Sequence, residues 1–306
     1  MLTDFNEWHW EVTKRCNLEC KHCVTNCGPR HIKEMSAGDM VRALKTMVDL
    51  GCRRLMITGG EPFFVQTKLM TILEECRNSG VKVQILTNGY FISNALVKKL
   101  AKIVESMSVS LDGSRPEVND PIRGQGSFEE AHKAIRLLKQ YMPVSVYLTV
   151  SRANLNDIKS TIGLARSLGA VNVHVSEIKI AGRALINREL FELTDGQKSR
   201  LQKLAKDLTP NSLVPLENCN ADLSVVYLSS SGMVFPCAEL SLDNQRSLIG
   251  NINSAGFEQR ILESKKNYER SSELNCCYQV YLGKNLSFYL GKETACPLAR
   301  KEEVSQ

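Results

Sequence analysis

The stretch that decides the fold is WHWEVTKRCNLECKHC, residues 8–23. It opens with a strand-like run over residues 8–13 and then places Cys16, Cys20 and Cys23 close together in the chain. Thiolates are the ligands that select iron–sulfur clusters or zinc, and a 4Fe–4S cluster normally takes four of them. A set of three therefore leaves one iron open to a ligand that is not part of the protein.

The same cysteines could instead form a zinc knuckle or a buried thiol cluster. Zinc sites usually pair two Cys-x-x-Cys units, whereas the gap between Cys16 and Cys20 is one residue longer than that pattern. The spacing therefore favours an iron–sulfur cluster over zinc.

Length and composition describe a chain that can bury a full core. With 306 residues and 43% hydrophobic content, we expect one large domain or a main domain with an appendage. We expect no membrane span, because no run of about 18 apolar residues is uninterrupted. Residues 1–7 lack the basic and apolar blocks of a signal peptide, so the 11 cysteines favour a reducing cytoplasm and metal ligation over disulfides.

The net charge of +6 is spread along the chain, for example at 98–99 and 265–266. No basic tract is interleaved with aromatic residues, so we expect no nucleic-acid partner. Most basic residues are interpreted as solvated helix faces, and an anionic substrate or cofactor stays open.

Short β-rich runs alternate with longer amphipathic segments. The expected strands cover residues 11–13, 54–58, 82–87, 106–111, 144–150 and 171–176. Six strands separated by helical patterns indicate parallel βα units, and six are too few to close the common eight-stranded barrel. We therefore predict an α/β fold with a partial (β/α)6 barrel that is open on one side. Folds of this kind bind ligands at the carboxyl ends of their strands.

Polar residues mark where the intervening helices begin. Ser36 stands three residues before Asp39, which resembles a capping box, and opens an apolar helical pattern that ends at Gly51. Ser93, Ser127 and Asn154 are expected to cap the helices that follow them in the same way.

The rhythm of the sequence changes after about residue 185. A helix is expected from Thr194 to about Leu208, and the runs 223–228 and 233–235 flank a Ser-Ser-Ser-Gly turn as a hairpin. We place a domain boundary near Ile186, which divides the chain into a barrel domain, residues 1–186, and a small cysteine-rich domain, residues 187–306.

Three short motifs follow expected strands. Gly59-Gly60-Glu61-Pro62 follows the second, Thr87-Asn88-Gly89 closes the third, and Ser110-Leu111-Asp112-Gly113 closes the fourth. Glycine suits a loop in which a ligand approaches the main chain closely, because no Cβ intervenes. Ordinary turns are the alternative, since Asn-Gly and Asp-Gly are common turn pairs. Their recurrence at successive strand ends favours a binding site.

The cysteine triplet, with His22 before its last cysteine, and the glycine-rich loop together resemble the radical S-adenosylmethionine (SAM) superfamily. The resemblance implies a 4Fe–4S cluster held by Cys16, Cys20 and Cys23, whose open iron is chelated by the amino and carboxylate groups of SAM. An electron from the reduced cluster then splits SAM to give a 5′-deoxyadenosyl radical, which abstracts hydrogen from a substrate carbon.

The resemblance also implies which other residues contact SAM or substrate. Gly59, Gly60, Glu61 and Pro62 would grip the amino group of SAM, and Thr87, Asn88, Ser110 and Asp112 would line the SAM and substrate region. On the sixth strand, Val175 and Glu177, together with Val173, resemble the segment that packs the adenine and orients the ribose. Glu177 could equally be an ordinary salt-bridge partner.

The loop from Ser114 to Gly124 resembles the superfamily branch with a cysteine-rich extension, which includes peptide maturases and sulfatase maturases. Asn119 stands where those enzymes often have His, and Arg123 could clamp a carboxylate or cap neighbouring carbonyls. Gly182-Arg183-Ala184 matches a short motif typical of the same branch.

A second cysteine set resembles the extension called SPASM or, in its halved form, twitch, which binds auxiliary iron–sulfur clusters. Cys219 and Cys237 flank Gly232 as in that unit, but only the adjacent Cys276 and Cys277 and the distant Cys296 follow them. We therefore expect one auxiliary 4Fe–4S cluster, held by Cys219, Cys237, one of the adjacent pair and Cys296.

Some thiols remain outside both sets. A spare thiol of the second set, or Cys27 just after the triplet, could return a hydrogen atom to a substrate radical. Cys52 and Cys76 lie inside helical patterns and are expected in the core.

The resemblance implies an oxidoreductase or epimerase-type enzyme acting on a ribosomally made peptide, by epimerisation, oxidation or crosslinking. An enzyme on a sugar or aminoglycoside is a second hypothesis, and an iron–sulfur electron carrier or zinc-structured binding protein is a third. The enzyme would need an electron donor such as flavodoxin or ferredoxin. No catalytic side chain can be assigned from the sequence.

Overall fold

A single nine-stranded sheet organises the protein in the computed structural model, which describes residues 5–30, 33–208, 225–238, 241 and 248–269. The strand order is β6-β5-β4-β3-β2-β1-β7-β8-β9. The strands are β1 Glu7–Glu11, β2 Arg54–Thr58, β3 Lys82–Thr87, β4 Ser106–Ser110, β5 Val144–Val150, β6 Asn172–Glu177, β7 Val225–Leu228, β8 Met233–Phe235 and β9 Gly250–Asn251.

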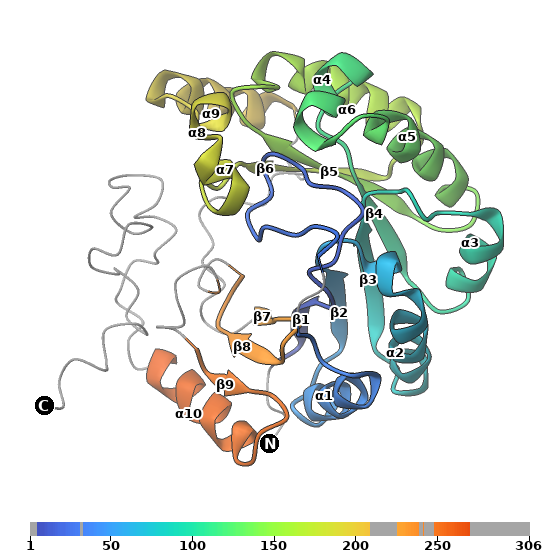
Figure 1. Ribbon diagram of the computed structural model, residues 1–306, viewed down its shortest axis with the longest axis vertical. Coiled ribbons are helices and arrows are strands. Elements are labelled where there is room, and N and C mark those ends of the chain that lie inside the picture. Colours follow the sequence, from blue (N-terminus) through green and yellow to red (C-terminus); the bar gives the residue numbers. More distant parts are fainter. Residues whose placement is uncertain (1–4, 31–32, 209–224, 239–240, 242–247, 270–306) are drawn as a thin grey trace, which may run out of the picture.

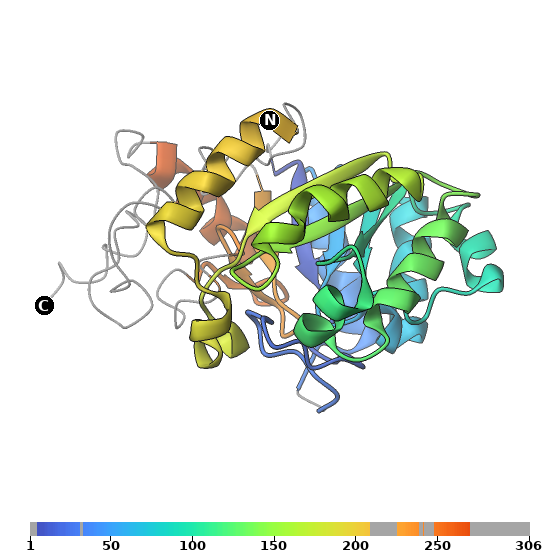
Figure 2. The same cartoon turned by 90° about the horizontal axis from the view of Figure 1, so that it is seen from above.

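Strands β1 to β6 pair in parallel, and helices connect them. These helices are α1 Ala37–Asp49, α2 Gln66–Asn78, α3 Asn94–Leu100, α4 Pro116–Arg123, α5 Ser127–Leu138 and α6 Ile158–Ser167. Figure 1 shows the sheet curled, with α1, α2, α3, α5 and α6 on its outer side, and Figure 2 shows the same arrangement from above, with α4 at the carboxyl ends of the strands. The predicted partial barrel is confirmed.

Strands β2, β3 and β5 have the predicted bounds, but the first strand was wrongly placed at 11–13. It spans Glu7–Glu11, because Trp8 and Trp10 alternate as fully buried side chains and pair in register with Leu55 and Ile57 of β2. The pairing ends soon afterwards, where the Thr13 hydroxyl turns to Glu34 Oε1 at 2.8 Å.

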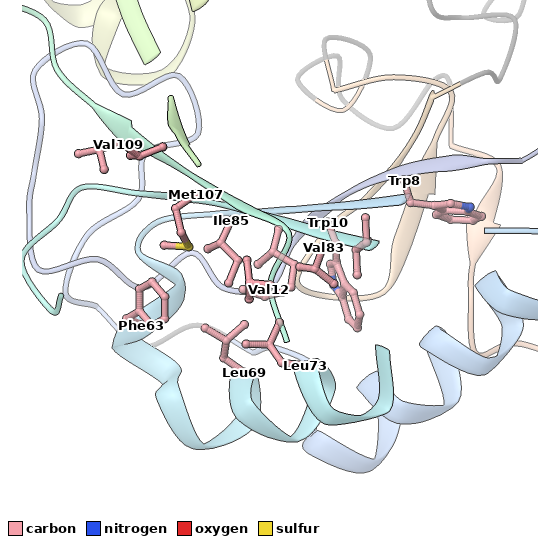
Figure 3. Close-up of a cluster of buried hydrophobic side chains, with 14 of the residues drawn as sticks. Trp8, Trp10, Val12, Phe63, Leu69, Leu73, Val83, Ile85, Met107 and Val109 are labelled. Atoms are coloured by element: carbon pink, nitrogen blue, oxygen red, sulfur yellow. The ribbon is translucent and has the colours of Figure 1, made fainter. Parts of the chain in front are cut away.

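The core lies between the curled sheet and the helices outside it. Figure 3 shows Leu69 and Leu73 of α2 directed at Val83 and Ile85 of β3, and all four side chains are fully buried. Each such side chain contributes roughly 1.5–3 kcal/mol by leaving water. Cys52 and Cys76 are buried in the same core, as predicted.

The predicted hairpin is confirmed and extends the barrel sheet. Strands β7 and β8 are antiparallel around the turn at Gly232, and β7 pairs in parallel with β1. One sheet therefore runs across the expected boundary near Ile186, and the division into two domains stays a prediction.

The later helices are α7 Gly182–Ile186, α8 Arg188–Phe191, α9 Asp195–Leu208 and α10 Phe257–Glu269. Helix α9 matches the helix expected from Thr194 to about Leu208. Among the described helices, none has both the length and the apolar character needed to cross a bilayer.

Two of the four predicted helix caps are correct. Ser36 forms a full capping box with Asp39, and the Ser93 hydroxyl accepts a bond from Leu96 N. Ser127 and Asn154 make no cap. The Ser127 hydroxyl donates to Asp120, and the Asn154 amide donates to the Asp112 carbonyl oxygen at 2.8 Å. The two side chains thus bond to helix α4 and to the loop that follows β4, in place of the helices they were expected to cap.

The capping box at Ser36 predicts that a serine-to-alanine substitution destabilises the protein there but not at Ser199, which lies outside any cap. Ser36→Ala removes the acceptor for Asp39 N and should lower the free energy of unfolding by about 1 kcal/mol. Ser199→Ala, on the exposed face of α9, should be neutral or slightly stabilising because alanine is the better helix former. Urea unfolding measures both, and equal losses in the two variants would contradict the assignment.

Candidate functional site

A cavity of about 310 Å³ opens at the carboxyl ends of the barrel strands. The loop after β1 lies inside the curve of the sheet beside α7 (Figure 1). The wall includes many of the residues expected from the sequence, namely Cys16, Cys20, Cys23, Gly59, Gly60, Thr87, Asn88 and Ser110. The separate motifs therefore meet at one site.

The three cysteines of the triplet are held on this wall by main-chain hydrogen bonds. Cys16 N donates to Gly28 O at 2.8 Å, and Cys23 N donates to Cys20 O at 3.1 Å. Within the described residues, no three His, Cys, Asp or Glu side chains gather closely enough to hold one metal ion.

The three thiols of the triplet differ in how readily they ionise. Burial raises the pKa of Cys16 to about 12 and that of Cys20 to about 11, whereas the hydrogen bond with Cys27 lowers the pKa of Cys23 to about 4. The thiolate is the form that ligates metal, so Cys16 and Cys20 would release protons to the solvent when a cationic cluster binds, and Cys23 would bind as a thiolate already formed. The donor set thus fits an iron–sulfur cluster.

The glycine-rich loop after β2 packs against the main chain just before Cys16. A Cβ on Gly60 would lie 2.3 Å from Arg15 O, and one on Gly59 would lie 2.3 Å from Thr13 O. Gly60 N donates to Thr13 O at 2.7 Å, and Glu61 N donates to Arg15 O at 2.9 Å. The missing side chains therefore make room for the protein's own backbone, and this contact sets the position of the cysteine loop.

Glu61 and Pro62 lie behind this wall and are buried, outside the cavity lining given by the described residues. The Glu61 carboxylate accepts bonds from Phe63 N at 3.1 Å, from the Thr87 hydroxyl at 2.9 Å and from Asn88 N at 2.7 Å. Burial raises the pKa of Glu61 to about 7 in spite of these bonds. Its carboxylate ties the glycine-rich loop to the end of β3, and a direct role in binding SAM stays a prediction.

Asn88 connects the end of β3 with the cysteine loop. Its Nδ2 lies 2.9 Å from Asn17 Oδ1 and 3.7 Å from Cys16 Sγ. An amide donor beside a ligand sulfur is one of the factors that tune an iron–sulfur cluster.

Asp112 is fully buried behind the cavity and is held by two basic side chains. Its Oδ2 lies 2.6 Å from Arg123 Nε and 3.0 Å from His22 Nε2. Burial opposes ionisation, but the contacts with Arg123 and His22 prevail and lower the pKa of Asp112 to about 2. Arg123 thus pairs with a carboxylate of its own chain.

His22 and Arg123 also line the cavity. By contacting both of them, the Asp112 carboxylate positions two side chains that face the cavity. The Nδ1 atom of His22 is buried and has no hydrogen-bond partner among the described residues. A buried polar atom without a partner is costly, which suits a site that receives a polar ligand. Asn119, at the position often taken by His, is buried and its Oδ1 accepts from Asp112 N at 2.8 Å.

The residues expected on β6 lie elsewhere. Val175 belongs to the core, and Glu177 is partly buried; neither is among the described residues that line the cavity. Lys179 and Arg183, just beyond the strand, do line it. The assignment of Val175 and Glu177 to SAM binding stays a prediction.

One wall was missed in the sequence because it joins residues far apart in the chain. Glu11 at the end of β1 and Tyr227 of β7 both line the cavity, and the buried Glu11 carboxylate accepts a bond from the Ser230 hydroxyl at 3.0 Å. Tyr227 also bonds to Glu11. A charged residue inside the first apolar strand was the only available signal.

Cys27 lies on the same cavity wall, where its sulfur is 3.0 Å from the Thr25 hydroxyl. Of the second cysteine set, Cys237 is described and buried. Cys219, Cys276, Cys277 and Cys296 lie outside the described residues. The ligands of a second cluster stay a prediction.

Comparisons with known proteins give a family match, similar sequences and a shared fold. The model of the radical SAM superfamily matches residues 10–165. An AdoMet-dependent heme synthase of Methanosarcina barkeri is 29% identical, covering 82% of this chain and 80% of that protein. The mycofactocin maturase MftC of Mycolicibacterium smegmatis is 27% identical, covering 86% and 71%. The crystal structure of Streptococcus suis SuiB bound to S-adenosylmethionine superposes with a TM-score of 0.70 at 17% identity, covering 95% and 77%, and shares the fold.

The tight contact of the glycine-rich loop predicts that Gly60→Ala is damaging. The added methyl would overlap the Arg15 carbonyl, and we expect a loss of about 1–3 kcal/mol in the free energy of unfolding. Gly163→Ala is the matched control, since a Cβ there meets nothing within 4 Å and should stabilise α6 by roughly 0.5–1 kcal/mol. Denaturant unfolding should separate the two, and similar values would refute the packing argument.

The buried Glu61 predicts a distinct pH dependence. Its pKa of about 7 lies above the 4.5 of a free glutamate, so the folded state holds the proton more tightly than the unfolded chain. Stability from this group therefore falls as pH rises from about 4.5 to about 7. Glu61→Gln cannot titrate and should show a weaker decline between pH 5 and pH 8, whereas the exposed Glu117→Gln should follow the wild type. Parallel curves for Glu61→Gln and wild type would contradict this.

Proposed function

This chain belongs to the radical SAM superfamily, and on that premise we propose that it modifies a small ribosomally made peptide through hydrogen abstraction by a SAM-derived radical. The observation that carries the proposal is the meeting of three thiols, Cys16, Cys20 and Cys23, with the glycine-rich loop and the ends of β3 and β4 on one cavity. A radical enzyme needs its cofactor and substrate side by side in a confined space.

The bound cluster and SAM would supply the one-electron chemistry that generates a deoxyadenosyl radical. We assign the protein the tasks of holding and orienting them: the triplet would bind the cluster, and the main chain at Gly59 and Gly60 would face the amino group of SAM. Arg183 also lines the cavity, its side-chain hydrogen bonds among the described residues go only to carbonyl oxygens, and its positive charge suits a carboxylate ligand.

The cavity wall also supports exclusion of water from a reactive radical. Leu18 and Tyr227 line it and are almost fully buried, and Glu11 beside Tyr227 is buried as well. Such a wall would limit quenching of the radical by solvent. We propose that the second cysteine set, Cys237 with cysteines outside the described residues, holds one auxiliary cluster that accepts an electron or binds substrate.

The names of similar proteins support a peptide substrate. One relative is a mycofactocin maturase, and the fold is shared with SuiB, which has also been crystallised bound to the precursor peptide SuiA. The similarity to an AdoMet-dependent heme synthase favours a second candidate, a small-molecule substrate with carboxylate groups. Epimerisation would require the substrate radical to take a hydrogen atom from a thiol, whereas oxidation or a crosslink would require it to lose an electron to an acceptor such as the auxiliary cluster.

Cofactor chemistry is tested by anaerobic reconstitution with iron and sulfide, followed by reduction in the presence of SAM. The wild type should carry about eight irons and release 5′-deoxyadenosine, and Cys16→Ala should lose about four irons and this activity. Cys52→Ala, in the core away from the cavity, is the matched control and should retain both. Undiminished 5′-deoxyadenosine formation by Cys16→Ala would refute the proposal.

The substrate class is tested with the same preparation. A short precursor peptide encoded beside this gene should change mass and accelerate SAM cleavage, whereas porphyrins and aminoglycosides should not. Turnover in deuterium oxide adds the reaction type, because deuterium on a product carbon indicates repair by a protein thiol. Processing of a porphyrin but of no peptide would favour the second candidate.

A further inference from the structure

Helix α7 docks on the cysteine loop mainly through one residue, Arg183. Its backbone N donates to Cys23 O at 2.9 Å, its Nε donates to Cys20 O at 2.8 Å, and its Nη2 donates to Cys27 O at 2.6 Å. One residue therefore binds three carbonyl oxygens across the second half of the loop. These carbonyls belong to two of the expected cluster ligands and to the cavity-lining Cys27.

The residue before it makes this docking possible. Gly182 has φ of 54°, and a Cβ there would lie 2.3 Å from Val24 O and 2.7 Å from Cys23 O. Asn187, at the end of α7, adds a bond from its Nδ2 to Lys21 O at 3.2 Å. The helix and the loop are thus fitted to each other at the level of the main chain.

The guanidinium of Arg183 also brings charge close to the thiols. Arg123, the other guanidinium near Cys20, is paired with the Asp112 carboxylate. Arg183 bonds only to carbonyl oxygens and has no carboxylate partner among the described residues. The Arg183 Nε atom lies 2.8 Å from the main-chain oxygen of Cys20, an expected cluster ligand. Arg183 therefore adds a net positive charge beside the expected cluster.

We propose that Arg183 is a positioning residue that fixes the loop carrying Cys20 and Cys23 and raises the reduction potential of the cluster bound there. This inference rests on the proposed function. A nearby cation stabilises the cluster state with one more electron, and net charge and hydrogen bonding are among the factors that set cluster potentials. A higher potential would ease reduction of the cluster by an external donor.

Two substitutions separate the two effects. Arg183→Met removes both charge and hydrogen bonds, whereas Arg183→Lys keeps the charge and loses the rigid fork that reaches two carbonyls at once. Arg188→Met is the matched control, because Arg188 lies on the next helix and its guanidinium pairs with Glu192. The readouts are an EPR-monitored redox titration of the reconstituted protein and the rate at which iron is lost to a chelator.

Arg183→Met should disfavour cluster reduction at least tenfold, which is a shift of about 59 mV to more negative potential. It should also lose iron several-fold faster than wild type. Arg183→Lys should keep most of the wild-type potential while losing iron faster, and Arg188→Met should match the wild type in both.

The two variants give independent ways to overturn the inference. Wild-type potential in Arg183→Met refutes the electrostatic part, and wild-type iron retention in Arg183→Lys refutes the positioning part, even if Arg183→Met fails to fold. If these variants match a wild type that cleaves SAM, the inference fails and the proposed function stands. A wild type that takes up no cluster overturns both.

Discussion

The close contact between the glycine-rich loop and residues 13–15 is the constraint on which the site depends. Strand β1 pairs with β2 as far as Glu11 and Thr58, and both chains then leave the sheet together. Their main chains can approach only because Gly59 and Gly60 have no side chains. The first cysteine follows directly, so the register of two strands fixes where Cys16 lies.

Two buried carboxylates brace the loops on either side of this contact, and their surroundings differ. Glu61 is held by neutral donors, so the cost of burial prevails and its pKa rises. Asp112 is held by Arg123 and His22, so its charge is favoured and its pKa falls. Glu61 ties the glycine-rich loop to the sheet, and Asp112 positions two side chains that face the cavity. Buried charges of this kind need partners, and each carboxylate has them.

Much of the fold could be predicted because it follows from local patterns. The strands β2, β3 and β5, the turn at Gly232 and the capping box at Ser36 all follow from periodicity or from turn chemistry within a few residues. The sequence also placed the motifs at strand ends correctly. It could not distinguish a side chain that faces the cavity from one that braces a loop, as with Glu61, because that depends on which partner packs behind it. The wall made by Glu11 and Tyr227 depends on a pairing of strands more than 200 residues apart, for which no local signal exists.

The pairing of β7 with β1 gives the cavity two walls that differ in how tightly they are fixed. The walls from β2, β3 and the cysteine loop carry the motifs expected to hold cluster and SAM, and tight main-chain contacts leave them little freedom to change. The opposite wall comes from the hairpin of β7 and β8, whose register with β1 is set by ordinary strand pairing. Its cavity-facing residue Tyr227 reaches the cavity from β7, on a strand separate from the cysteine loop. We therefore expect the hairpin side of the cavity to hold residues of this chain that distinguish one substrate from another.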